Sequence, residues 1–214
     1  NSQGIQTNPN KPSVINKPNP IVSLNPALIT SNTRLIIQYY SDPNTWNSSM
    51  LNLAQLNGIK PSDRIANTLA AHTLFGNGGG VIVVDFGTST NLDVVSTKGE
   101  FLGGALAPGI EISVDALASR AAQLRKVELI KPRSPIGKNT VEALQSGTIY
   151  GFAGQVDGLV RRITDELAES SNGKVTVVAT GGLASLVIGE CETIDFHEPD
   201  LTLIGLRLVH ERNH

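Results

Sequence analysis

Residues 81–84 (VIVV) form an unbroken run of β-branched apolar side chains, and this run constrains the possible folds most strongly. A glycine-rich loop at residues 76–80 precedes it, and the sequence DFG follows it. A run of this kind favours a strand that is covered on both faces, because a strand with one solvent face alternates apolar and polar side chains. The run therefore predicts a buried strand with other layers on both sides of its sheet.

The sequence on either side of this run predicts both helices and strands. Helix signals occur at residues 63–74, 110–124, 140–167 and 201–212, with shorter helices at 48–56 and after residue 182. Strand signals occur at residues 34–40, 91–96, 101–107 and 175–179. Short turns join strands 81–84, 91–96 and 101–107 into a meander. This order predicts an α/β fold with a mixed sheet flanked by helices.

The composition of the chain changes near residue 60. Residues 1–26 are rich in Asn and Pro, and their repeated Asn-Pro and Lys-Pro pairs cannot sustain a helix or a central strand. Only two of the 21 glycines, Gly4 and Gly58, precede residue 60. We therefore expect an atypical, irregular segment at residues 1–60 and a regular α/β domain at residues 61–214.

Charge and cysteine content exclude several classes of function. With 17 basic and 19 acidic residues the formal net charge is -2, which does not favour nucleic acid or an anionic membrane as the main partner. A single cysteine, Cys191, excludes an internal disulfide and a cysteine-based metal cluster, so a reducing, cytoplasmic compartment is expected. The four histidines lack metal-ligand spacing. No run of about 18 apolar residues occurs, so no membrane span is expected.

The first chemically informative segment is residues 85–90 (DFGTST), directly after the predicted buried strand. Gly87 allows a tight turn in which backbone N–H groups and the three hydroxyls of residues 88–90 can point at one anion. Asp85 can hold a cation or a water molecule beside bound phosphates. An ordinary hairpin, in which the Ser and Thr side chains cap their own backbone, explains the segment equally well.

Two further segments place polar or small residues at helix starts. Gly181 and Gly182 connect a predicted strand to a helix and leave room for a flat or anionic ligand, although such a pair more often forms only a tight turn. Ser62, Asp63 and Arg64 open a helix, and an acid beside an arginine offers a general base and an anion clamp. Helix capping by the aspartate, with a solvated arginine, is the more common situation.

The predicted helix at residues 140–167 carries two more features. It opens with GKNT, which lacks Walker spacing, and Thr140 either caps the helix or presents its hydroxyl to a ligand. Four glycines share one helical face, at positions 147, 151, 154 and 158. Because each costs about 1 kcal/mol of helix stability relative to alanine, the stripe predicts close approach of another backbone, within the fold or across a dimer.

Together these segments resemble type III pantothenate kinase of the actin-like ATPase superfamily, most closely its actinobacterial branch. The resemblance spans residues 61–213 and is carried by DRIAN, VVDFGTST, DVVSTKGEFLGGALAPGI, VELIKPRSPIGKNTVEALQSGTIYGFAGQVDGLVRRI, ATGGLA and LTLIGLRLVHERN. It implies a duplicated ribonuclease-H-like fold, with residues 61–214 as the second lobe. It also implies a homodimer that phosphorylates pantothenate with ATP, the first step of coenzyme A synthesis, and needs a monovalent cation (K⁺ or NH₄⁺) and Mg²⁺ with ATP.

On the acceptor side, the resemblance assigns Asp63 as the catalytic base, within the GADR motif of the family. Ser62 and Arg64 match the pantothenate-binding segment, although Pro61 and Ser62 stand where the family has Gly and Ala. Thr140 matches a threonine that contacts the substrate. These matches imply that Asp63 takes the proton from the pantothenate hydroxyl as its oxygen attacks the γ-phosphoryl group in line.

On the nucleotide side, the resemblance assigns Asp85 as the potassium-binding aspartate. Gly87 and Thr88 match the second phosphate motif, in which the threonine contacts ATP. Gly181 and Gly182 match the adenosine motif. Asp63 and Asp85 are therefore expected to face each other across one cleft.

One motif of the family has no counterpart in this chain. The family begins with a strand and a DxGNT phosphate loop. The only similar segment before Asp63 is residues 42–45 (DPNT), which lack the glycine. We therefore expect residues 1–60 to be an incomplete or atypical remnant of the first lobe. The alternative function is that of a non-catalytic relative that binds nucleotide or pantothenate and acts through a partner.

Overall fold

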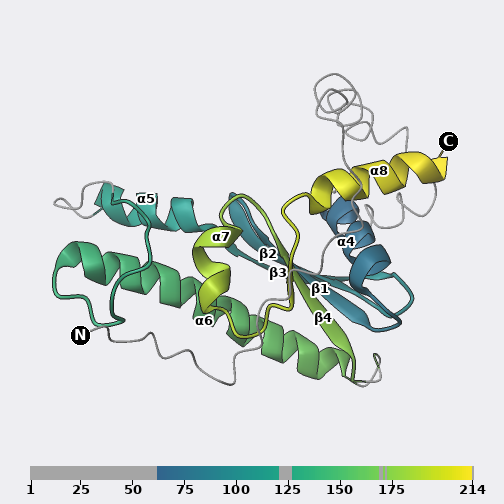
Figure 1. Ribbon diagram of the computed structural model, residues 1–214, viewed down its shortest axis with the longest axis horizontal. Helices are drawn as coiled ribbons and strands as arrows, with labels where there is room; N and C mark the ends of the chain where they lie inside the picture. Colours follow the sequence, from purple (N-terminus) through teal and green to yellow (C-terminus); the bar gives the residue numbers. More distant parts are fainter. Residues whose placement is uncertain (1–61, 121–126, 169–170, 172, 214) are drawn as a thin grey trace, which may run out of the picture.

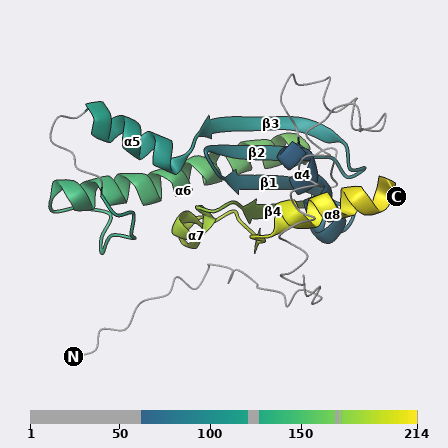
Figure 2. The same ribbon diagram turned by 90° about the horizontal axis from the view of Figure 1, so that it is seen from above.

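The computed structural model describes residues 62–213 apart from 121–126, 169–170 and 172. The predicted strand at 34–40, the predicted helix at 48–56 and the whole segment 1–60 lie outside the described residues. The described part forms one five-stranded mixed sheet with helices on both faces (Figures 1 and 2), which confirms the predicted α/β class.

The sheet has the strand order β3-β2-β1-β4-β5. Three antiparallel strands form the predicted meander, and β4 and β5 continue the sheet parallel to β1. A meander extended in this way beside its first strand is the topology of a ribonuclease-H-like lobe. The strands are β1 (Gly80–Phe86), β2 (Ser89–Val95), β3 (Phe101–Pro108), β4 (Val175–Thr180) and β5 (Phe196–His197).

Helices cover both faces of this sheet (Figures 1 and 2). One face packs against α6 and α7, and the other packs against α4 and α8. The helices are α4 (Ser62–Phe75), α5 (Ile110–Arg120), α6 (Thr140–Leu167), α7 (Ala184–Val187), the 3-10 helix η2 (Ile188–Glu190) and α8 (Leu201–Asn213). No helix in the described ranges is long and apolar enough to cross a membrane.

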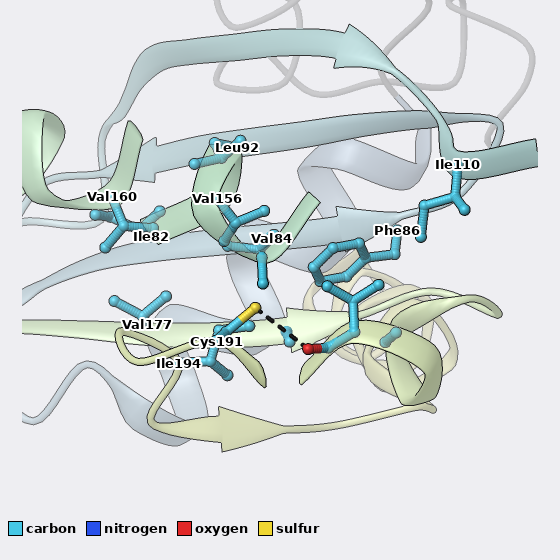
Figure 3. Close-up of a cluster of buried hydrophobic side chains, with 14 of the residues drawn as sticks. Ile82, Val84, Phe86, Leu92, Ile110, Val156, Val160, Val177, Cys191 and Ile194 are labelled. Carbon is cyan, nitrogen blue, oxygen red and sulfur yellow. Dashed lines mark hydrogen bonds between the residues drawn. The ribbon is translucent and has the colours of Figure 1, made fainter. Parts of the chain in front are cut away.

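Strand β1 is buried on both faces, as its sequence predicts. Ile82, Val84 and Phe86 point into the cluster under α6 and α7 (Figure 3), while Val81 and Val83 point toward α4 and α8. None of the five is more than 1% exposed. Each such side chain contributes about 1.5–3 kcal/mol when fully buried. The strand is therefore a rigid support for Asp85, which follows this apolar run.

Helices α4 and α8 approach each other closely at Gly205. A Cβ atom at this position would overlap the carbonyl oxygen of Ala66 in α4, so only glycine fits without a shift of one helix. The approach also lets the Thr202 hydroxyl of α8 donate a 2.7 Å hydrogen bond to Oδ1 of Asn67 in α4. The position of α8 thus fixes Asn67, whose side chain is hydrogen-bonded to Asp85 at the end of β1.

The structure adds one strand that the sequence did not predict and corrects the cap of one helix. Strand β5 was not predicted, because two residues paired in parallel with β4 leave no periodic pattern. Asn139, not Thr140, caps α6: its Oδ1 accepts a 3.0 Å hydrogen bond from the backbone N–H of Glu142. The alternative in which Thr140 caps the helix is therefore wrong, and Thr140 is the exposed first residue of α6.

Candidate functional site

The first turns of α4 lie over the end of β1. Asp63 and Asn67 are four residues apart and so share one face of this helix. The Asn67 side chain is buried and donates a 3.1 Å hydrogen bond from Nδ2 to Oδ2 of Asp85. Asp63 is exposed, and its Oδ1 accepts a 2.8 Å hydrogen bond from the backbone N–H of Arg64. An exposed carboxylate at a helix start therefore lies beside a partly buried carboxylate at a strand end.

The electrostatics of Asp85 agree with the position of the predicted base one helical turn before Asn67, which is hydrogen-bonded to Asp85. Burial raises the pKa of the Asp85 carboxyl above its ordinary value, and the negative charges of Asp63 and Asp93 raise it further. The hydrogen bond from Asn67 acts in the opposite direction. The carboxylates of Asp85 and Asp93 thus lie on the face of the sheet that α4 covers, with Asp63 in the first turn of that helix, and a cation bound at Asp85 would relieve the repulsion.

The two predicted glycine segments meet at the same carboxylate. Gly181 has a φ of 96°, a conformation that favours glycine, and a Cβ there would lie 2.6 Å from both Oδ1 of Asp85 and the Phe86 carbonyl oxygen. A Cβ at Gly87 would lie 3.6 Å from the same Oδ1. The backbone N–H of Leu183 donates a 3.2 Å hydrogen bond to the Phe86 carbonyl. The β1–β2 turn and the turn after β4 therefore form adjacent walls around Asp85.

The three hydroxyls of residues 88–90 do not converge, contrary to the sequence-based expectation. Strand β2 begins at Ser89, so Ser89 and Thr90 point to opposite faces of the sheet. Ser89 donates its hydroxyl to Oδ1 of Asn91 at 3.1 Å, and the Thr90 hydroxyl is buried without a hydrogen-bond partner in the described part. Thr88 alone is exposed, in the turn beside Asp85.

Arg64 is bound to the sheet by a carboxylate that the sequence analysis did not single out. Its Nε donates a 2.8 Å hydrogen bond to Oδ1 of Asp93 in β2, and its Nη2 contacts the same oxygen. Its Cζ also lies 5.4 Å from the centroid of the Phe101 ring in β3. A charged residue inside the otherwise apolar sequence LDVV is a signal that could have drawn attention to Asp93.

Thr140 lies far from this group of residues. The helix that it opens, α6, begins beside α5, at the end of the described part away from α4 and α8, as both ribbon views show (Figures 1 and 2). The structure therefore joins Asp63, Arg64, Asp85, Gly87 and Gly181 in one region but does not bring Thr140 to it within one chain. Ser62 is the first residue of α4, and Gly182 is exposed next to Gly181.

The glycine stripe on α6 faces no neighbouring backbone in the described part of the chain. A Cβ atom at Gly147, Gly151 or Gly154 would meet nothing within 4 Å, and one at Gly158 would meet only the side chain of Arg162. Within the described residues, the stripe therefore accommodates no close approach of another backbone. An approach from a second copy of the chain is the alternative that stays open.

Among the described residues, no group of three or more His, Cys, Asp and Glu side chains has the arrangement of a metal site. Cys191 is buried, and its Sγ donates to the Val187 carbonyl oxygen at 3.6 Å (Figure 3). The thiol is therefore part of the hydrophobic core. A cation at Asp85 would accordingly rest on one carboxylate together with backbone or ligand oxygens. That donor set suits a weakly bound hard cation and not a transition metal.

Comparison with known proteins agrees with these features. The model of the type III pantothenate kinase family matches residues 20–162. The chain is 70% identical over 152 residues to a type III pantothenate kinase of Saccharopolyspora erythraea, and 74% identical over 152 residues to one of Frankia alni. Each alignment covers 71% of this chain, and 57% and 58% of the two relatives respectively, so the chain spans little more than half of their length. The chain belongs to the type III pantothenate kinase family.

Proposed function

We propose that the protein transfers the γ-phosphoryl group of ATP to pantothenate and so makes 4'-phosphopantothenate, the first step of coenzyme A synthesis. The observation that carries this proposal is geometric: the exposed Asp63 lies one helical turn before Asn67, and Asn67 is hydrogen-bonded to Asp85, which the two glycine turns flank. The family and its named relatives support a kinase over the non-catalytic alternative. Residues 61–214 would serve as the second lobe, and residues 1–60 as the atypical remnant of the first.

Asp63 is the proposed general base. One of its oxygens accepts from the backbone of Arg64, which fixes the carboxylate and leaves the other oxygen for the acceptor hydroxyl. As the hydroxyl oxygen bonds to the γ-phosphorus, its proton passes to Asp63 and the bond from phosphorus to the β–γ bridging oxygen breaks. ADP leaves with the electron pair of that bond. Because little covalent chemistry falls to the protein, positioning and charge stabilisation account for most of the rate.

The two glycine turns are the proposed nucleotide contacts. Gly87 and Thr88 would meet the phosphates, because the turn lacks a side chain at one position and offers an exposed hydroxyl at the next. Gly181 and Gly182 would meet the adenosine, since the absence of side chains lets a flat ligand approach the backbone. Any other residue at position 181 would have a strained backbone and a Cβ too close to Asp85, which explains why glycine occupies this position.

Asp85 is the proposed ligand of the monovalent cation, K⁺ or NH₄⁺. The residues fit this group: Asn67 occupies only Oδ2 of Asp85, and the nearby carboxylates leave excess negative charge. When bound, the monovalent cation and the Mg²⁺ that accompanies ATP offset charge on the phosphates. The chain's own contribution is to hold the Asp85 carboxylate at a fixed strand end.

Arg64, Ser62 and Thr140 are the proposed pantothenate contacts. Arg64 and Ser62 adjoin the base, but Thr140 opens α6, which begins at the end of the described part away from α4 (Figure 1). A second copy could supply Thr140, which favours the homodimer that the family resemblance implies. The open glycine face of α6 and the exposed Val141 beside Thr140 offer a surface for that contact. A cytoplasmic location suits a reaction that consumes ATP.

The homodimer is tested by Gly154→Leu, which fills the open face of α6. Wild-type protein is expected to sediment as a dimer and the variant as a monomer, because the leucine prevents close approach of the second copy. Glu166→Leu, at an exposed position of α6 about two turns beyond the last glycine of the stripe, is the matched control and should stay dimeric. A wild-type monomer, or a variant that dimerises as tightly as the control, would contradict the proposed interface.

The reaction is tested by incubating the protein with ATP and pantothenate and detecting 4'-phosphopantothenate by mass spectrometry. Product is expected in K⁺ or NH₄⁺ buffer and much less of it in Na⁺ buffer. Asp85→Asn should lower the rate in K⁺ and remove most of the difference between the buffers, because the variant lacks the anionic ligand. Binding of ATP and pantothenate without product in any of the three buffers would instead support the non-catalytic alternative.

A further inference from the structure

The Arg64 guanidinium is held at its edge by Asp93. Its Nε and Nη2 groups both engage Oδ1 of that carboxylate, across a sequence separation of 29 residues. The side chain of Asp93 is 1% exposed and that of Arg64 is 13% exposed, so the pair is largely shielded from water. An arginine at the exposed start of a helix would otherwise sample many rotamers. Strand β2 therefore fixes a side chain that α4 alone would leave free.

The Phe101 ring packs against the face of the Arg64 guanidinium. Its ring centroid lies 5.4 Å from Cζ of Arg64, within the range of a cation–π contact. Edge contact to β2 and face contact to β3 together define both the position and the plane of the guanidinium. The described residues give no hydrogen-bond partner to Nη1, the remaining nitrogen of the fork.

The pair is not arranged as a simple stabilising ion pair. Oδ2 of Asp93 is buried without a hydrogen-bond partner in the described part of the chain. A buried carboxylate with one oxygen unpaired is unfavourable, and a buried ion pair as such is weak evidence for stability. A strand residue that tolerates this penalty while orienting an arginine beside the base points to a role in ligand binding.

We propose that Asp93 is a positioning residue, which holds Arg64 so that Nη1 is presented to an anionic oxygen of a substrate. This role deepens the proposed function and rests on it. The anionic oxygen belongs either to the carboxylate of pantothenate or to the phosphoryl group that ATP donates. Both sources present the same chemistry to a guanidinium, and they are distinguished by the acceptor used in the experiment.

The experiment compares wild type, Asp93→Asn, Arg64→Gln and the double variant. Steady-state kinetics are measured with pantothenate and with its alcohol analogue, in which CH₂OH replaces the carboxylate. If Arg64 binds the carboxylate, Asp93→Asn should raise KM for pantothenate about tenfold or more and leave KM for the analogue unchanged. If Arg64 binds the phosphoryl group, Asp93→Asn should lower kcat with both acceptors. Either pattern supports the proposal.

The double variant separates positioning from a general structural effect. If Asp93 acts through Arg64, the effect of Asp93→Asn should disappear in the Arg64→Gln background. An equal effect in both backgrounds, or no effect in either, would overturn the proposal. Asp195→Asn is the matched control, because Asp195 accepts a 2.8 Å hydrogen bond from the backbone of Val177, near the opposite edge of the sheet. Its kinetics should equal those of wild type.

Two further measurements keep the inference testable. Phe101→Leu removes the ring but keeps an apolar side chain, and it should change the kinetics in the same direction as Asp93→Asn even if Asp93→Asn does not fold. Calorimetric titration with pantothenate compares the same variants without turnover. A wild-type protein that binds pantothenate but makes no product would refute the proposed reaction, and the Kd values would then decide the role of Asp93.

Discussion

Replacing Asp63 with asparagine is expected to lower kcat for pantothenate phosphorylation by about 10²–10⁴-fold, the usual contribution of a general base. Asparagine keeps the shape and can still accept from the backbone N–H of Arg64, but it cannot take the hydroxyl proton. The side chain is exposed, so the fold should be unaffected. The measurement is product formation at saturating ATP and pantothenate, together with the thermal unfolding curve of each protein.

Asp115→Asn is the matched control for this prediction. Asp115 is also an exposed helical aspartate, but it lies in α5, away from Asp63. The control should turn over at the wild-type rate. A kcat for Asp63→Asn within a few-fold of wild type would show that another group accepts the proton, and the assignment of the base would be wrong.

Gly205→Ala is expected to have the largest effect on stability. Alanine favours a helix by about 1 kcal/mol relative to glycine, but its Cβ would overlap the Ala66 carbonyl oxygen and force α8 away from α4. Overpacking of this kind destabilises by about 1–3 kcal/mol. The measurement is urea unfolding, in which the midpoint should fall with little change in slope. Displacement of α8 should also weaken the hydrogen bond from Thr202 to Asn67 and so loosen Asp85.

Gly189→Ala serves as the control for the glycine substitution. Gly189 is exposed in η2, its φ is ordinary and a Cβ there meets nothing within 4 Å. Its unfolding midpoint should match or exceed that of wild type. If Gly205→Ala unfolded at the same urea concentration as Gly189→Ala, the close packing of α4 and α8 would not be what positions Asn67.

Local sequence signals were sufficient for most of the fold. The run at 81–84 predicted a strand buried on both faces, and the structure confirms β1 in this position. The predicted helix at 140–167 coincides with α6, because apolar periodicity continues through its glycines. Strand β5 was not predicted, because it depends on pairing with β4 and its two residues have no periodic sequence pattern. The parts that could be predicted are thus those that local periodicity specifies.

The candidate site could be predicted only in part, for a related reason. Asp63, Asp85 and the glycines stand in recognisable local motifs. Asn67 and Asp93 acquire their roles from contacts across 18 and 29 residues, which no local pattern reveals. The hydroxyls of residues 88–90 were expected to converge because the start of β2 at Ser89 was not foreseen, and a strand sends successive side chains to opposite faces.

The most direct measurement is a crystal structure of the protein with pantothenate and a non-hydrolysable ATP analogue. The acceptor hydroxyl should lie about 2.6–3.2 Å from a carboxylate oxygen of Asp63. The terminal phosphate of the analogue should lie between that hydroxyl and the turn at Gly87 and Thr88. Pantothenate bound away from Asp63, or a nucleotide bound on the α6 face of the sheet, would contradict a shared site for the two substrates.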